Sequence, residues 1–319
     1  MKRPRPKKTK ENLPRLRCWR LAEPKFYTLL EKRGFARITI VPVETNGIVS
    51  SKKIKEVLKN NTILVSVMYA NNEIGTIQPI KEIAKEIRHY KKTIAKSLVP
   101  NTYPVFHTDA VQAANYLDLN VEKLGIDLLT LSGSKIEGAG RVGVLYKKNN
   151  VSISRIMGGG DQELGLRPGT ENLAEILKFS SAFKEMDQNK DKEVKRLTLL
   201  RDYFFNQLEH SHILKNVGML VNGDLVNRLP NSVSITIPTI PSDLLVIELS
   251  SCGIMTSSKS ACKSSKKDGS YVIEALRPSS NPEIGGVRFS FGKGTNKKDI
   301  DYTVASLEEI LTKLKKWYN

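Results

Sequence analysis

The chain has 319 residues, a formal net charge of +18 at pH 7, and 39% hydrophobic and 7% aromatic residues, which excludes a disordered chain and suffices for one substantial core and a second, smaller one. It contains neither the roughly 18 uninterrupted apolar residues of a membrane span nor the apolar stretch of a signal peptide, so we expect a cytoplasmic protein with no membrane partner. The three cysteines are too few and too scattered for a disulfide framework or a zinc knuckle, which fits a reducing compartment and predicts no metal site.

The N-terminal segment 1–21 is the most basic part of the chain. Nine lysines and arginines within residues 1–20 stand against a single acid, Glu11, so this segment supplies +8 of the net charge. Its composition is typical of a disordered tail. The other positive charge is spread over predicted helical faces, which usually lie in solvent. We therefore expect no specific nucleic-acid binding, while a nonspecific affinity for polyanions stays open.

Strand-like and helix-like patterns alternate between residues 36 and 190. The strand-like runs are nearly continuous in apolar or β-branched residues, as in a sheet with helices on both faces. These runs are 36–43, 62–70, 105–110, 128–133 and 141–146. Helical periodicity marks 51–60 and 79–90. The alternation predicts an α/β fold, in which ligands gather at the ends of the strands.

The pattern changes from residue 191 onward. The predicted elements are a long helix and two strands, at 193–209, near 231–238 and at 287–292. A closing helix follows, which Thr295 or Asn296 can cap. Its apolar residues recur on one stripe, formed by Ile300, Val304, Leu307, Ile310, Leu311 and Leu314. We predict a smaller α+β domain over 191–319.

Two polar motifs follow predicted strands, and they contain Asp109 and Lys135. An acid at the end of one strand and a lysine just beyond a neighbouring strand can converge on one ligand. A pyridoxal-phosphate (PLP) site needs this pair, because a carboxylate keeps the pyridine nitrogen protonated and an amine forms the Schiff base. From spacing alone, a buried salt bridge or two unrelated surface residues remain as alternatives.

Seven runs resemble, in order, the signatures of cysteine desulfurases of the class V aminotransferase group, which are NifS-like and PLP-dependent. They are MYANNEIGT at 68–76, HTDAVQ at 107–112, SGSK at 132–135, GGGDQE at 158–163, RPGTEN at 167–172, SSKSAC at 257–262 and VRFSFG at 287–292. The resemblance covers roughly residues 23–319. It implies the fold type I of PLP-dependent transferases, with a PLP-binding large domain at 22–190 built on a mixed, mostly parallel sheet, plus the smaller C-terminal domain.

The same resemblance implies the residues that bind the cofactor. Lys135 is the Schiff-base lysine, and Asp109 is the partner of the pyridine nitrogen. Asn72 and Gln112 flank the ring and its phenolic oxygen. Three hydroxyl groups meet phosphates, and they belong to Ser132, Ser134 and Thr170. Ser134 replaces the usual histidine of the family, and Thr170 reaches the phosphate of the neighbouring subunit, which implies a homodimer.

The resemblance also implies a substrate and a reaction. Arg288, together with Asn72, grips the carboxylate of L-cysteine, since a planar guanidinium can make two parallel hydrogen bonds. Lys135 moves a proton from the substrate carbon, and Cys262 takes the sulfur as a persulfide, which leaves alanine. We expect Cys262 to lie on a mobile polar loop at about 256–269. The sulfur then goes to an acceptor, such as a scaffold of iron-sulfur cluster assembly or a tRNA-thiolation protein.

The sequence departs from the family pattern near its N-terminus. Family members have a Gly-Ala-Thr-Glu type loop that cradles the cofactor phosphate, and a histidine that stacks on the pyridine ring. Residues 20–26, which correspond to the histidine context, contain no histidine. We therefore expect a large domain that lacks its N-terminal part. Two alternatives stay open: an inactive fragment or scaffold of the same family, and a selenocysteine lyase or other class V aminotransferase.

Overall fold

The computed structural model describes residues 15–19, 29–94, 103–258, 270–278 and 285–318. The chain divides into two compact units. The first comprises Met1–Val41, Ser51–Tyr69 and Pro79–Asn189, and the second comprises Pro42–Ser50, Ala70–Gln78 and Lys190–Asn319. Within the described residues, no helix is both long enough and apolar enough to cross a membrane.

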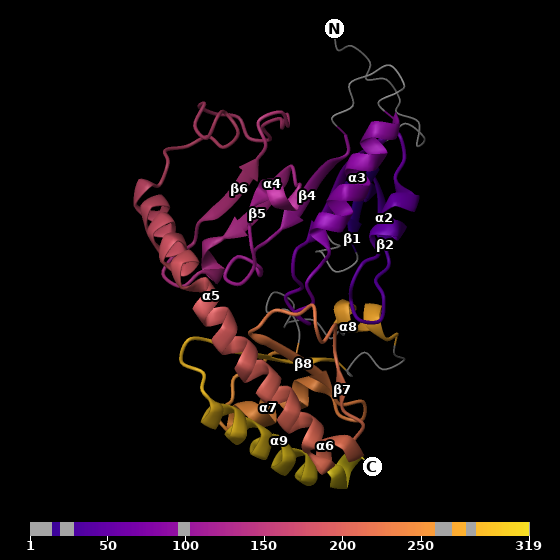
Figure 1. Ribbon diagram of the computed structural model, residues 1–319, viewed down its shortest axis with the longest axis vertical. Coiled ribbons are helices and arrows are strands. Elements are labelled where there is room, and N and C mark those ends of the chain that lie inside the picture. The colour runs from indigo at the N-terminus through magenta and orange to yellow at the C-terminus, as the bar shows by residue number, and fades with distance from the viewer. Residues whose placement is uncertain (1–14, 20–28, 95–102, 259–269, 279–284, 319) are drawn as a thin grey trace. The chain divides into compact units, whose positions relative to one another are not determined.

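The first unit is built on a six-stranded sheet in the order β2-β1-β3-β4-β5-β6 (Figure 1). The strands are β1 Arg15–Trp19, β2 Arg37–Val41, β3 Thr62–Met68, β4 Val105–Asp109, β5 Leu128–Ser132 and β6 Gly143–Lys147. Neighbouring strands run parallel except β5 and β6, which are antiparallel. The predicted mixed, mostly parallel sheet is therefore confirmed, and each of the five predicted strand-like runs contains a strand or most of one.

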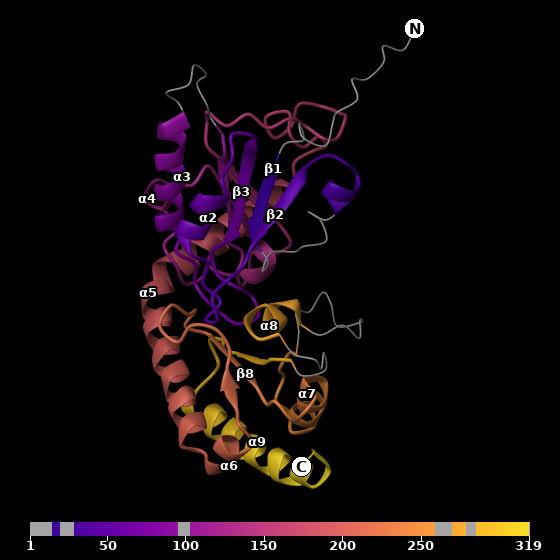
Figure 2. The same ribbon diagram turned by 90° about the vertical axis from the view of Figure 1, so that its right-hand side faces the viewer.

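Three helices lie on one face of this sheet, α2 Ser51–Val57, α3 Ile80–Ile94 and α4 Val121–Leu124 (Figure 2). The helix α3 buries Ile80, Ile83, Ala84 and Ile87, which recur at helical spacing on one stripe. The side chain of Asn120 caps α4 by accepting a hydrogen bond from the backbone N–H of Lys123. The helices predicted at 51–60 and 79–90 are thus α2 and α3.

The structure corrects the prediction of a disordered tail over residues 1–21. Residues 15–19 form β1, which lies inside the sheet between β2 and β3 and pairs in parallel with both. The remainder of the predicted tail lies outside the described residues. A strand of this kind is held by backbone hydrogen bonds to two other strands, so its charged composition did not reveal it.

The long helix α5 extends over Leu173–His210, so it begins well before the predicted start at residue 193. Leu173 and Leu177, in its first turns, are 67% and 66% exposed. The sequence analysis therefore missed residues 173–192 of this helix. The boundary between the two units falls within α5, close to the predicted domain boundary at 190/191.

The second unit contains a three-stranded antiparallel sheet in the order β7-β8-β9. Its further elements are α6 His212–Asn216, β7 Leu220–Val221, β8 Ser232–Thr236, α7 Ser242–Ser251, α8 Tyr271–Leu276, β9 Val287–Ser290 and α9 Lys297–Tyr318. The predicted apolar stripe of α9 is buried along its whole length. Asn296 caps this helix through its side-chain oxygen, which accepts from the N–H of Lys298, while Asp299 accepts from the N–H of Asn296.

Residues 42–50 and 70–78 belong to the second unit, although the contiguous large domain predicted at 22–190 included them. Hydrogen bonds between residues that are far apart in sequence explain this difference. Gln78 donates to the carbonyl of Gly47 at 2.8 Å and accepts from the N–H of Val49. Asn46 donates to a carboxylate oxygen of Asp224 at 2.8 Å. These contacts bind both segments to the C-terminal part of the chain.

Candidate cofactor and substrate residues

Asp109 and Lys135 lie at the same edge of the large sheet. Asp109 is the last residue of β4, and Lys135 ends a short 3₁₀ turn, Gly133–Lys135, that directly follows β5. The strands β4 and β5 are parallel neighbours in which Asp109 stands opposite Thr130. The side-chain amide of Asn115, in the turn after Asp109, donates to the backbone carbonyl of Lys135 at 2.7 Å. The two segments after these strands are therefore joined directly.

The carboxyl group of Asp109 is half-buried. Its Oδ1 accepts a hydrogen bond from the backbone N–H of Val111 at 2.9 Å. Burial raises the pKa of Asp109, and the hydrogen bond from Val111 opposes this only in part. Within the part of the chain that the structure describes, no lysine or arginine forms an ion pair with this group. Asp109 is thus a carboxylate in need of a positive partner.

His107 lies two residues before Asp109 on the same strand, so both side chains face the same side of the sheet. Its Nδ1 is hydrogen-bonded to the hydroxyl of Ser66 on β3, and its Nε2 to the hydroxyl of Thr130 on β5, both at 2.8 Å. Burial lowers the pKa of His107 to about 4, so the ring is neutral near pH 7. The ring ties three strands together beside Asp109. The sequence analysis did not single out Ser66 and Thr130, which hold this ring.

Ser132 and Ser134 lie beside Lys135. Their hydroxyl groups are hydrogen-bonded to each other at 2.8 Å, and Ser134 and Lys135 are exposed. Gly133, which lies between the two serines, is buried. A Cβ atom at this position would come within 2.9 Å of the carbonyl oxygens of Ala139 and Gly140. Glycine is therefore required for this tight turn. The turn presents two hydroxyl groups and one amine together.

Gln112 and Thr170 also belong to the first unit. Gln112 is half-buried in the turn that follows Asp109. Thr170 is exposed and lines a hollow of about 620 Å³. The same hollow is lined by three cationic side chains, those of Arg141, Arg167 and Lys178, and by three acidic ones, those of Glu163, Glu171 and Glu175. Its lining is therefore mixed in charge and does not by itself select an anionic group.

Asn72 and Arg288 come together in the second unit. Nη1 of Arg288 donates to the backbone carbonyl of Asn72 at 2.6 Å. Burial lowers the pKa of Arg288, and the negative charge of Glu73 acts in the opposite direction. The backbone of Arg288 pairs with that of Ser257 through two hydrogen bonds, at 2.8 and 3.2 Å. The sequence analysis did not single out Glu73, although its run MYANNEIGT contains this residue.

Cys262 and most of its predicted loop at 256–269 lie outside the described residues. Only 256–258 of that segment belong to the structure described here. The predicted site residues therefore form two described groups. One group, in the first unit, is Asp109, Gln112, Ser132, Ser134, Lys135 and Thr170, and the other, in the second unit, is Asn72 and Arg288.

The donors in the first unit fit PLP. A pyridinium N–H would give the carboxylate of Asp109 the positive partner that it lacks among the described residues. The exposed amine of Lys135 is suited to form the covalent link, and neighbouring serine hydroxyl groups can donate to a phosphate. An acid, an amine and hydroxyl groups at one sheet edge are the chemistry that this cofactor requires.

Comparisons with known proteins agree with this chemistry. The family profile described as Aminotransferase class-V matches residues 26–303. The cysteine desulfurase IscS of Dictyoglomus turgidum is 39% identical over 287 residues, which are 90% of this chain and 68% of that protein. The enzyme of the same name from Clostridium botulinum is 38% identical over 282 residues, 88% of this chain and 67% of that protein.

Solved structures of NifS-like proteins have the same fold. One matches with a TM-score of 0.80 and 27% identity, over 95% of this chain and 76% of that chain. The NifS-like protein from Rickettsia africae matches with a TM-score of 0.79 and 26% identity, over 95% and 77% of the respective chains.

Proposed function

Since the chain belongs to the aminotransferase class-V family, and within it to the cysteine desulfurases, we propose that it removes sulfur from L-cysteine with PLP as cofactor. One observation carries this proposal. The carboxylate of Asp109, which no cation neutralises among the described residues, lies at the same sheet edge as the exposed amine of Lys135. This pairing supports PLP because the two groups match its pyridine nitrogen and its aldehyde.

Each residue of the first group would have one task toward the cofactor. Asp109 would hold a proton on the pyridine nitrogen, and the backbone N–H of Val111 holds its carboxylate in place. Lys135 would provide the covalent link and then move a proton at the substrate carbon. The hydroxyl groups of Ser132, Ser134 and Thr170 would hold phosphate oxygens. When bound, PLP supplies the electron sink that makes the substrate carbon acidic.

The second group would bind the substrate. The guanidinium of Arg288 would receive the carboxylate of L-cysteine, and Asn72 fixes one arm of that guanidinium. The thiolate of Cys262 would form a bond to the substrate sulfur as the bond between that sulfur and carbon breaks. The persulfide then stays on Cys262, and the carbon takes up a proton to give alanine.

We propose a homodimer as the working form. Four apolar side chains between residues 156 and 177 of the first unit are strongly exposed, with exposed fractions of 94% for Ile156, 91% for Leu164, 67% for Leu173 and 66% for Leu177. Exposed apolar side chains favour burial against a protein partner. A second copy would cover them and bring its own Thr170 toward a neighbouring site. The acceptor of the sulfur would be an iron-sulfur scaffold or a tRNA-thiolation protein.

The test is direct. The purified chain is supplied with PLP, L-cysteine and a thiol reductant, which reduces the persulfide on Cys262 and frees its outer sulfur as sulfide. We expect the visible absorption of the lysine-bound cofactor together with release of alanine and sulfide. Lys135→Ala should abolish the absorption and the turnover. Cys262→Ala should keep the absorption and lose the turnover. A wild-type chain that shows neither absorption nor turnover, alone or with L-cysteine, would contradict the proposal.

A further inference from the structure

The loop that contains Asn72 and Glu73 has a conformation set by its own hydrogen bonds. The side-chain oxygen of Asn71 accepts from the backbone N–H groups of Glu73 and Ile74, at 2.9 and 3.0 Å. The N–H of Asn71 donates to the carbonyl of Thr76, and its own carbonyl accepts from Gly75. Asn71 is fully buried. These bonds define the direction in which the carbonyl of Asn72 and the side chain of Glu73 leave the loop.

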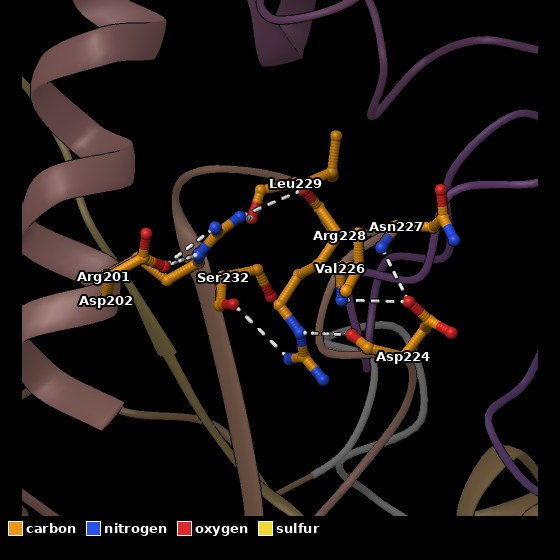
Figure 3. A network of polar contacts seen from close by, with 8 residues as sticks. All are labelled: Arg201, Asp202, Asp224, Val226, Asn227, Arg228, Leu229 and Ser232. Atoms are coloured by element: carbon orange, nitrogen blue, oxygen red, sulfur yellow. Dashed lines mark hydrogen bonds and ion pairs between the residues drawn. The ribbon is translucent and has the colours of Figure 1, made fainter. Parts of the chain in front are cut away.

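A buried arginine network lies next in sequence to Leu229, which is hydrogen-bonded to this loop; Figure 3 shows the network. Arg228 is only 3% exposed, and its guanidinium donates to the backbone carbonyls of Asn222, Asp224 and Ser232. Arg201 in turn donates to the carbonyl of Arg228 at 3.1 Å. The next residue, Leu229, donates its N–H to the carbonyl of Gly75 at 2.9 Å. The loop is thus hydrogen-bonded to a segment of the second unit that a buried arginine holds in place.

The guanidinium of Arg288 is only partly fixed by the loop. Nη1 donates to the carbonyl of Asn72 at 2.6 Å, while Nε is buried and has no hydrogen-bond partner among the described residues. Among the described residues, this one hydrogen bond holds only one arm of the guanidinium. A fork that is to receive a carboxylate by two parallel hydrogen bonds needs a defined plane. A fixed negative charge nearby can add an electrostatic constraint.

Glu73 is placed to supply this constraint. It follows Asn72 directly and is 5% exposed. Its Oε2 accepts a hydrogen bond from the hydroxyl of Ser270 at 2.5 Å, which secures the carboxylate. The negative charge of Glu73 acts on Arg288, where it opposes the effect of burial on the pKa of the guanidinium. A charge held in a low-dielectric environment acts strongly over short distances.

We propose that Glu73 is a positioning residue for Arg288, whose buried charge holds the guanidinium in the orientation that receives the carboxylate of the substrate. This inference rests on the proposed function, because it presupposes that Arg288 binds a substrate carboxylate. Glu73 touches no substrate in this role. It acts through the arginine, so it determines the selection of amino acids over simple amines.

Ser270 provides a matched control, because the Glu73–Ser270 bond could also serve helix α8 alone. The hydroxyl of Ser270 caps α8 by accepting from the N–H of Ile273. Glu73→Gln keeps the size and an oxygen acceptor for Ser270 but removes the charge. Ser270→Ala keeps the charge and removes both hydrogen bonds. The two variants therefore separate the charge of Glu73 from the capping of α8.

Two measurements on the PLP-loaded protein test the inference. For Glu73→Gln we expect KM for L-cysteine to rise by about tenfold with kcat changed by less than about twofold, as for lost binding of one charged group. For Ser270→Ala we expect KM to change by less than about threefold. Calorimetry should show that Glu73→Gln weakens the binding of L-alanine by about tenfold but not that of ethylamine, which has no carboxylate.

Four outcomes would overturn the inference or its basis. If Glu73→Gln binds L-alanine as well as the wild type does, the charge of Glu73 does not act through Arg288. If Ser270→Ala has the same raised KM as Glu73→Gln, and the two variants lower the melting temperature equally, Glu73 serves α8 and not Arg288. A wild-type chain that binds L-alanine but releases no sulfur from L-cysteine contradicts the proposed function and leaves the inference supported by calorimetry. A wild-type chain that binds no L-alanine contradicts both.

Discussion

The side-chain amide of Asn115 donates to the backbone carbonyl of Lys135 at 2.7 Å, although the two residues lie in turns after different strands. This bond joins the turn that follows Asp109 to the turn that ends at Lys135. The other side-chain atom of Asn115, Oδ1, is buried and has no hydrogen-bond partner among the described residues. Asn115 therefore couples the proposed partner of the pyridine nitrogen to the proposed lysine.

Asn115→Ala should weaken PLP binding by about fivefold, since a hydrogen bond of this kind contributes about 1 kcal/mol. The loss would act through the position of Lys135, which is itself retained. The measurement is a titration of the variant with PLP, followed by the absorption of the lysine-bound cofactor. Asn189→Ala is the matched control, because Asn189 also donates to a backbone carbonyl, that of Glu185. An equal loss in both variants would exclude the coupling.

Asp109→Asn should stabilise the protein without PLP and destabilise its complex with PLP. Burial raises the pKa of Asp109 above its ordinary value of 3.8. The group's favourable contribution to the free energy of unfolding is therefore complete below pH 3.8 and is lost as the pH rises through the pKa of the folded state. At pH 7 the buried charge therefore opposes folding until a pyridinium partner is bound. Melting temperatures of both proteins at pH 7, with and without PLP, test this. Turnover should fall by at least about 100-fold. An equal gain in melting temperature on adding PLP to both proteins would contradict the prediction.

His107 should make the stability depend on pH in acid. Burial lowers its pKa from 6.5 to about 4, so its contribution to stability is present above 6.5 and is lost as the pH falls toward about 4. In His107→Gln the loss of stability between pH 6.5 and 4 should be smaller than in the wild type, because glutamine cannot titrate. Chemical unfolding at several pH values across this window measures the effect. Identical slopes for both proteins would show that His107 is not the responsible group.

Gly75→Ala should unfold more easily and bind L-cysteine less well. Gly75 has a φ of +74°, and a Cβ there would lie 2.9 Å from the Cβ of Ser232. We expect a loss of about 1–3 kcal/mol in the free energy of unfolding, together with a higher KM because Asn72 lies in the same loop. Gly294→Ala is the control, since no atom lies within 4 Å of a Cβ at that position. Equal unfolding free energies for both variants would contradict the expected strain.

Leu173→Asp should shift the proposed homodimer toward the monomer. Leu173 is 67% exposed in the first turn of α5 and is one of the four strongly exposed apolar residues between 156 and 177. Leu199→Asp on the same helix is the control, since Leu199 is 73% exposed but lies in the second unit. Sedimentation velocity at several concentrations measures the effect. A monomeric wild type, or equal dissociation of both variants, would show that these exposed residues do not form the dimer interface.

Local patterns predicted much of the fold and part of the site. Continuous apolar runs revealed β2 to β6, and helical spacing revealed α2, α3 and α9 with its buried stripe. The positions of Asp109 and Lys135 after two successive parallel strands predicted a common sheet edge, and the structure has both residues there. These features depend on residues close in sequence, so the order of residue types suffices to identify them.

The sequence by itself determined the family, the alternation of strands and helices, and the residue types that suit PLP. Only the tertiary structure decided that residues 15–19 form an inner strand, that 70–78 joins the second unit, and that Glu73 accepts a hydrogen bond from Ser270, 197 residues away. The physical reason is the same in each case. Backbone pairing and the burial of a charge depend on what the rest of the chain brings to that point, and local composition carries no record of the partner.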